Sequence, residues 1–147
     1  MYGDADVIRR RSTELHEQAV DLRTLADRLV AGAESVDWPG RAANDLRLRM
    51  RDRAARLRDA AGQHETASEA LATHGTSVAD LTEAIADVER KVASLVADAR
   101  GRQAELSSYD DAAGVTRTLD PDDQQLVDFA PPPSGHKDWL TVTLPGL

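Results

Sequence analysis

The chain has 147 residues, a length that suits one domain, and 41% of them are apolar although only 3% are aromatic. Its formal net charge is −8 and it has no cysteine, which excludes disulfide bonds and thiolate metal sites and argues against nucleic acid as a partner. We expect no membrane insertion and no ordinary signal peptide, because no long apolar run occurs and the segment MYGDADVIRRR lacks an apolar core.

Residues 5–36 carry a heptad seam that predicts the first helix. Large apolar side chains recur every seven residues, and an alanine follows each of the middle three by four positions. The members are Ile8, Leu15, Leu22, Leu29 and Val36, with Ala19, Ala26 and Ala33. Leucines alternating with alanines along one face predict a neighbouring helix at close range.

The segment VDWPGRAANDL follows and predicts an elbow at residues 37–41. Pro39 disfavours helix at Trp38 but suits the first turn of a following helix. Gly40 has no side chain, so it would allow a neighbouring helix to approach closely or Trp38 to fold back over the elbow.

Two heptad rows predict a second helix over residues 41–108. The first row is Met50, Leu57, His64, Leu71, Val78, Ile85, Val92, Ala99 and Leu106, and the second is Leu46, Arg53, Ala60, Ala67, His74, Leu81, Val88, Leu95 and Arg102. Gly75, followed by Thr76 and Ser77, is typical of a helix stop and a fresh cap. The heptad count nevertheless continues across it, which favours one long helix over a three-helix bundle and leaves Gly75 as the candidate position for a kink.

The fold class predicted is therefore all-α, an elongated antiparallel helical hairpin. Its second helix would overhang the first by about half its length. The overhang carries the most apolar seam of the chain, formed by Val78, Leu81, Ile85, Val88, Val92 and Leu95. Either the chain's own tail or another protein must cover such a stripe, and we interpret it as a partner-binding seam that lacks a cover within the chain.

Residues 109–147 differ from the hairpin domain, residues 1–108. They are acidic, interrupted by proline and glycine, and without a helical period, which predicts a mostly irregular tail. The ending WLTVTLPGL alternates Leu140, Val142 and Leu144 with polar residues, as a short strand does.

The motifs of catalysis and metal binding are missing. The sequence has no glycine-rich phosphate loop and no His-Glu-x-x-His, and Asp120, Asp122 and Asp123 lack the glycine and glutamate of a calcium loop. His64 and His74 would lie about 15 Å apart along a helix, too far to share a metal. Seven arginines oppose two aspartates in residues 41–58, which a solvated helix face explains more simply than nucleic acid does. We expect no enzyme, no metal and no cofactor.

The pattern Trp38, Gly40, Ala42, Ala43 and Leu46, set between two heptad segments, resembles the elbow of Trp-x-Gly helical-hairpin proteins. Such proteins are exported by the type VII (ESX) secretion systems of actinobacteria. The resemblance covers roughly residues 5–110, and the longer second helix and tail look more like the larger exported members. It implies a secreted, non-enzymatic helical protein, cytoplasmic before export, that acts as a heterodimer with a Trp-x-Gly subunit or an effector and meets the secretion ATPase indirectly.

The same family carries a Tyr-x-x-x-Asp/Glu export signal after the second helix. Tyr109 stands at that place, but Ala113 replaces the acid, and the nearest acids are Asp110 and Asp111. The signal is therefore degenerate, and the partner subunit would carry the intact one. Two alternatives remain, a cytosolic coiled-coil adaptor and the targeting domain of a secreted toxin.

Overall fold

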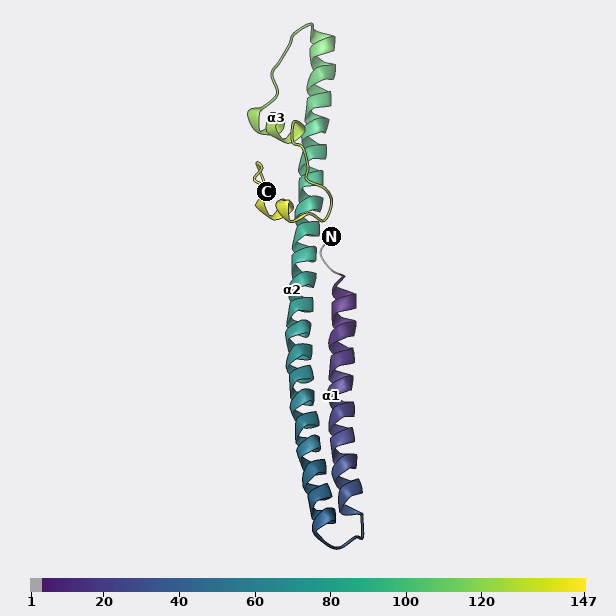
Figure 1. Ribbon diagram of the computed structural model, residues 1–147. Helices are drawn as coiled ribbons and strands as arrows, with labels where there is room; N and C mark the ends of the chain where they lie inside the picture. The colour runs from purple at the N-terminus through teal and green to yellow at the C-terminus, as the bar shows by residue number, and fades with distance from the viewer. Residues whose placement is uncertain (1–3) are drawn as a thin grey trace. The chain divides into compact units, whose positions relative to one another are not determined.

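The computed structural model describes residues 4–147, and that part of the chain is helical with no strand. Its elements are α1 (Ala5–Glu34), α2 (Arg41–Ala113), α3 (Pro121–Val127) and the short 3-10 helix η1 (Lys137–Thr141). The long helices α1 and α2 pack together, as Figure 1 shows, which confirms the predicted all-α hairpin. The chain divides into two compact units: one holds α1 with α2 as far as Val78, and the other holds α2 from Ala79 with the C-terminal segment.

Local side-chain contacts define both ends of α1. Asp4 precedes the helix, and its carboxylate accepts a hydrogen bond of 2.9 Å from the backbone N–H of Asp6. The acid satisfies one of the free amides of the first turn and suits the positive end of the helix dipole. Ser35 closes the other end, because its N–H donates to the carbonyl of Ala31 and its hydroxyl to that of Gly32.

The elbow lies at residues 36–40, close to its predicted place, but three of its residues act differently from expectation. Pro39 precedes α2 instead of standing in its first turn. Gly40 has φ +113°, and a Cβ built there would meet nothing within 4 Å. The glycine is therefore required by the backbone conformation and not by a close approach. Trp38 stays 54% exposed and does not fold back over the elbow.

Helix α2 runs through Gly75 without a break, so the prediction of one continuous helix is confirmed, and it ends at Ala113, five residues beyond the predicted end. In the first unit the buried positions of α2 include a row of small residues seven apart, which was not part of the two predicted heptad rows. The row is Ala54, Ala61, Ser68 and Gly75, and its counterpart on α1 is Ser12, Ala19, Ala26 and Ala33.

Ser12 and Ser68 fix the antiparallel register of these two rows. Each hydroxyl donates to the other residue's backbone carbonyl, at 2.9 and 2.8 Å. Stepping one heptad away from this pair, forward on α1 and back on α2, brings Ala19 opposite Ala61, and both are completely buried. The two helices therefore pack at their closest through hydroxyl and methyl groups, and the larger leucines flank this line.

Gly75 is packed against Ile8 of α1. A Cβ at this position would stand 3.1 Å from Cγ2 of Ile8, whereas a Cβ at Gly62 would meet nothing within 4 Å. Gly62→Ala should raise the free energy of unfolding by about 0.5–1 kcal/mol through helix propensity. Gly75→Ala should gain less, because Ile8 must shift to admit the methyl group. Urea unfolding followed by circular dichroism measures both, and equal gains would contradict a close approach at Gly75.

The second unit has its own core, built from α2 and the C-terminal segment. Its buried members are Ile85, Val92, Ala99, Leu126, Trp139 and Leu144. The segment after α2 is mostly irregular, as predicted, but it packs on the helix. The strand expected in WLTVTLPGL is wrong, because Lys137–Thr141 forms η1, with the N–H of Trp139 donating to the carbonyl of His136.

Candidate protein-binding interface

Ion pairs close one face of the hairpin in the first unit. Glu65 of α2 accepts from His16 Nδ1 at 2.7 Å and from the Arg23 guanidinium at 3.1 Å. Asp27 pairs with Arg58 at 2.7 Å, and Glu34 pairs with Arg51. The α2 members stand seven residues apart, so these contacts run along one side of the helix pair. We call this side the ion-pair face.

Glu65 is the most strongly engaged acid of the ion-pair face. The hydrogen bond from His16, and after it the one from Arg23, lowers the pKa of its carboxyl below the ordinary value of 4.5. A carboxyl with a lowered pKa in the folded state stabilises that state above its unfolded pKa and loses this contribution as the pH falls through the folded value.

Glu65→Gln should therefore lower the melting temperature at pH 7 and should have a fading effect as the pH drops below about 4.5. Above the unfolded pKa of the carboxyl, the ionised Glu65 contributes its full stabilisation to the folded wild-type chain. A glutamine does not titrate, so it provides no such pH-dependent stabilisation. Thermal melts of both chains between pH 3 and pH 7 test this expectation. A difference in melting temperature that stays constant down to pH 3 would show that Glu65 does not act through its charge.

The opposite side of the hairpin carries leucines. On both helices, the residue four positions after a small buried one lies on the ion-pair face, whereas the residue three positions after it lies on the other side. The second set is half-buried and comprises Leu15, Leu22 and Leu29 of α1 with Leu57, His64 and Leu71 of α2. Leu25, at helical spacing from Leu22 and Leu29, is 48% exposed. These seven residues form what we call the leucine face.

His64 is the one polar member of the leucine face. Its Nδ1 is buried and has no hydrogen-bond partner among the described residues. The sequence predicted that His64 and His74 are polar positions in the heptad rows, and the structure places His64 between the helices and His74 on the exposed surface. No group of three His, Asp or Glu side chains in residues 4–147 is arranged to hold a metal ion.

The predicted partner seam divides into buried and exposed members. Val78, Ile85 and Val92 are buried, Val88 and Leu95 are partly buried, and Leu81 is 49% exposed. The expectation that this seam lacks a cover within the chain is wrong for most of it. Leu126, Trp139 and Leu144 pack against Ile85 and Val92, because an aromatic and two leucines bring enough apolar surface to bind the stripe without a helical period.

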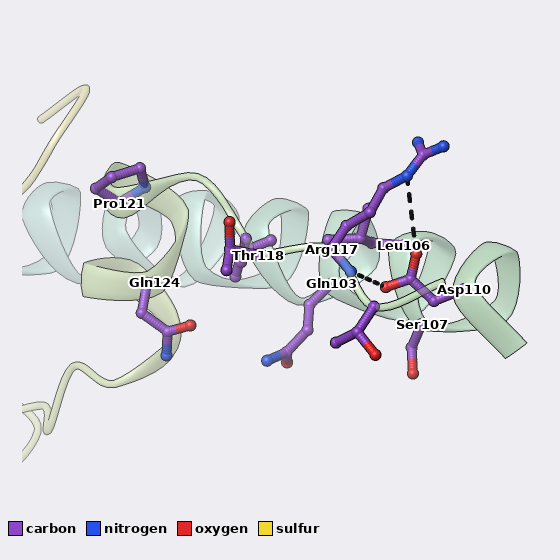
Figure 2. A pocket seen from close by; sticks show the side chains of 10 residues that line it. Gln103, Leu106, Ser107, Asp110, Arg117, Thr118, Pro121 and Gln124 are labelled. Atoms are coloured by element: carbon purple, nitrogen blue, oxygen red, sulfur yellow. Dashed lines mark hydrogen bonds and ion pairs between the residues drawn. The ribbon is translucent and has the colours of Figure 1, made fainter. Parts of the chain in front are cut away.

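Tyr109, Asp110 and Asp111 lie in the last turns of α2. Figure 2 shows Asp110 beside Arg117, where the chain reverses. Asp110 accepts a hydrogen bond of 2.7 Å from the backbone N–H of Arg117, and the Arg117 guanidinium lies 4.2 Å over the ring of Tyr109. Asp111 is exposed. Two residues of the predicted degenerate signal thus take part in holding the return of the chain.

A cavity of about 620 Å³ opens beside this reversal. Polar and apolar side chains both line it, and the polar ones include Gln103, Ser107, Asp110, Thr116, Arg117 and Gln124. Oδ1 of Asp110 is buried without a hydrogen bond, although the Arg117 guanidinium lies 3.9 Å away.

Comparisons with known proteins identify no relative, so the function of the chain is inferred from the geometry described above. The chain matches no family model, no curated protein and no solved structure. Among residues 4–147, no helix combines the length and the apolar character that a membrane crossing requires. The leucine face and the exposed Trp38 are therefore the surfaces on which a functional hypothesis rests. The heptad pattern of the sequence identified the leucines. It did not show that the leucines and the ion pairs lie on opposite faces, because that depends on which row of residues is innermost.

Proposed function

We propose that this chain is a non-enzymatic helical partner protein of type VII secretion, either a substrate or the co-secreted escort of one. It binds another helical protein through its leucine face. The partner is a second Trp-x-Gly subunit or a secreted effector, and the secretion ATPase is met through that complex. The chain is then cytoplasmic before export and leaves the cell without an ordinary signal peptide.

The asymmetry of the hairpin carries this proposal. One side is closed by ion pairs, whereas the other offers half-buried leucines along about two heptads of each helix. A two-helix pair leaves such leucines partly in water, and further helices packed on that side remove them from it. Burial of Leu25 alone, with an exposed fraction of 48%, would add to the affinity of a complex.

The elbow supports the secretion part of the proposal. Trp38 and Gly40 lie at the tip of a helical hairpin, and the indole is 54% exposed. A large exposed aromatic at a turn contributes little to folding and suits recognition by another protein. Tyr109 and Asp110 support the alternative of a cytosolic adaptor. Both contact Arg117 as part of the folded chain, so they are not free to act as an export signal.

Export is tested with Trp38→Ala in an actinobacterial host that has a type VII system. The variant should keep its helicity and lose most of its appearance in the culture filtrate, while Leu48→Ala, which removes another exposed apolar side chain, should be exported like the wild type. The host without a working ATPase gives the background. A wild-type chain that stays in the cytosol with its partner co-expressed and the system active would defeat export and favour the adaptor.

A further inference from the structure

The C-terminal segment contacts α2 through a core of apolar side chains and two polar clusters. Leu126, Trp139 and Leu144 supply the apolar part. Asp123 accepts two hydrogen bonds from Arg102, at 2.7 and 2.5 Å, and these bonds lower the pKa of its carboxyl. Glu89 accepts from the hydroxyl of Ser134 at 3.0 Å and from the backbone N–H of Gly135. We call residues 119–144 the C-terminal arm, and all of these contacts are to α2.

The arm reaches α2 through a short and exposed connection. Residues 114–118 are exposed, and Gly114 has φ +65°. Asp110 holds this connection, because its carbonyl accepts from the N–H of Val115 and its carboxylate from that of Arg117. We call this reversal, held by Asp110, Gly114 and the Arg117–Tyr109 contact, the hinge, and other side chains form the arm and its docking surface.

The hinge also has little spare length. Arg102, the partner of Asp123, stands eleven residues before the end of α2, which is about 16 Å along the helix. The seven residues between α2 and α3 span at most about 25 Å when extended. With three of them removed, the remaining four would span about 14 Å, so that α3 could return to Arg102 only with the linker fully extended.

We propose that the arm is exchangeable, so that it docks on α2 of its own chain or on α2 of a second copy of this chain. A second copy presents the same Ile85 and Val92 surface and the same Arg102, so the docked contacts are identical in both cases. The hinge alone decides between them. A short linker gives the arm an effective concentration on the order of millimolar, which keeps the wild-type arm on its own chain at ordinary concentrations.

Deleting Gly114, Val115 and Thr116 should convert the monomer to a dimer in which each arm lies on the other copy. In a Trp38→Phe background Trp139 is the only tryptophan, and its fluorescence should keep the blue emission of a buried indole. A chain with three glycines inserted after Gly114 should remain a monomer with the same emission. A deletion chain that is monomeric by light scattering and has red-shifted emission would overturn the proposal.

A complementation experiment tests the exchange with full-length chains and without a deletion. Val92→Asp destroys the docking surface but keeps the arm, and Trp139→Ala destroys the arm but keeps the surface. Circular dichroism should show α2 intact in both. Mixed in the Trp38→Phe background at up to about 1 mM, they should form a heterodimer in which Trp139 of the first chain shifts to the blue. No heterodimer and no shift at that concentration would refute exchange. Because only this chain takes part, the result is independent of the helical partner and of export.

Discussion

Ala26→Leu is expected to destabilise the first unit strongly, because the small row leaves no space for a larger side chain. Ala26 is completely buried, and the register places it opposite Ala54, which is equally buried. A leucine there forces the two backbones apart, which costs about 3 kcal/mol, the upper end of typical overpacking penalties. Separation of the helices would also weaken the ion pairs and the Ser12–Ser68 hydrogen bonds.

Ala31→Leu is the matched control, since Ala31 is exposed on the same helix. It should change the free energy of unfolding by less than about 0.5 kcal/mol. Urea unfolding of the two variants and the wild type gives the comparison. Equal stability of the two leucine variants would show that α1 and α2 do not meet through their small residues.

Trp139→Ala is expected to release the C-terminal arm from α2. Trp139 is only 6% exposed, packs edge to face on Phe129 at a ring distance of 6.2 Å, and donates its indole N–H to the carbonyl of Pro133 at 3.0 Å. Truncation of a buried tryptophan costs about 3–5 kcal/mol, and Trp139 is the largest of the side chains through which the arm packs on α2.

Hydrogen exchange of residues 119–144 measures this release, and limited proteolysis near Gly114 supports it. The rates of hydrogen exchange and of proteolysis should rise strongly in Trp139→Ala. The control is Leu140→Ala, which removes a neighbouring side chain with an exposed fraction of 44% and should leave both rates unchanged. An arm that stays protected without Trp139 would mean that its polar contacts with Glu89 and Arg102 suffice to hold it.

Heptad spacing predicted the two long helices and the continuity of α2 through Gly75. The reason is physical, because a seam that keeps its phase across a glycine can pack only if the helix is not interrupted there. The innermost row was missed since Ala54, Ala61 and Ser68 carry little hydrophobic signal. A small side chain is favoured at a close contact for its volume, and volume complementarity depends on the register with the other helix.

The docking of the C-terminal arm could not be predicted from local pattern. Trp139 and Leu126 belong to segments without a period, and only their packing on Ile85 and Val92 shows which surface they cover. The alternation in WLTVTLPGL indicated a strand, but a strand without a neighbour leaves its backbone groups unpaired. The 3-10 bonds from Trp139 N–H to His136 and from Val142 N–H to Trp139 satisfy part of them locally.

Partner binding through the leucine face is tested most directly by two aspartate substitutions on α1, one on the leucine face and one on the ion-pair face. Leu25 and Val20 are 48% and 47% exposed, so an aspartate at either should leave the hairpin folded. Leu25 lies beside Leu22 and Leu29, whereas Val20 lies beside His16 and Arg23 on the ion-pair side. The measurement is co-purification of a helical partner with the tagged full-length chain from its host.

We expect Leu25→Asp to abolish recovery of the partner and Val20→Asp to preserve it. Loss with Val20→Asp and recovery with Leu25→Asp would contradict this expectation.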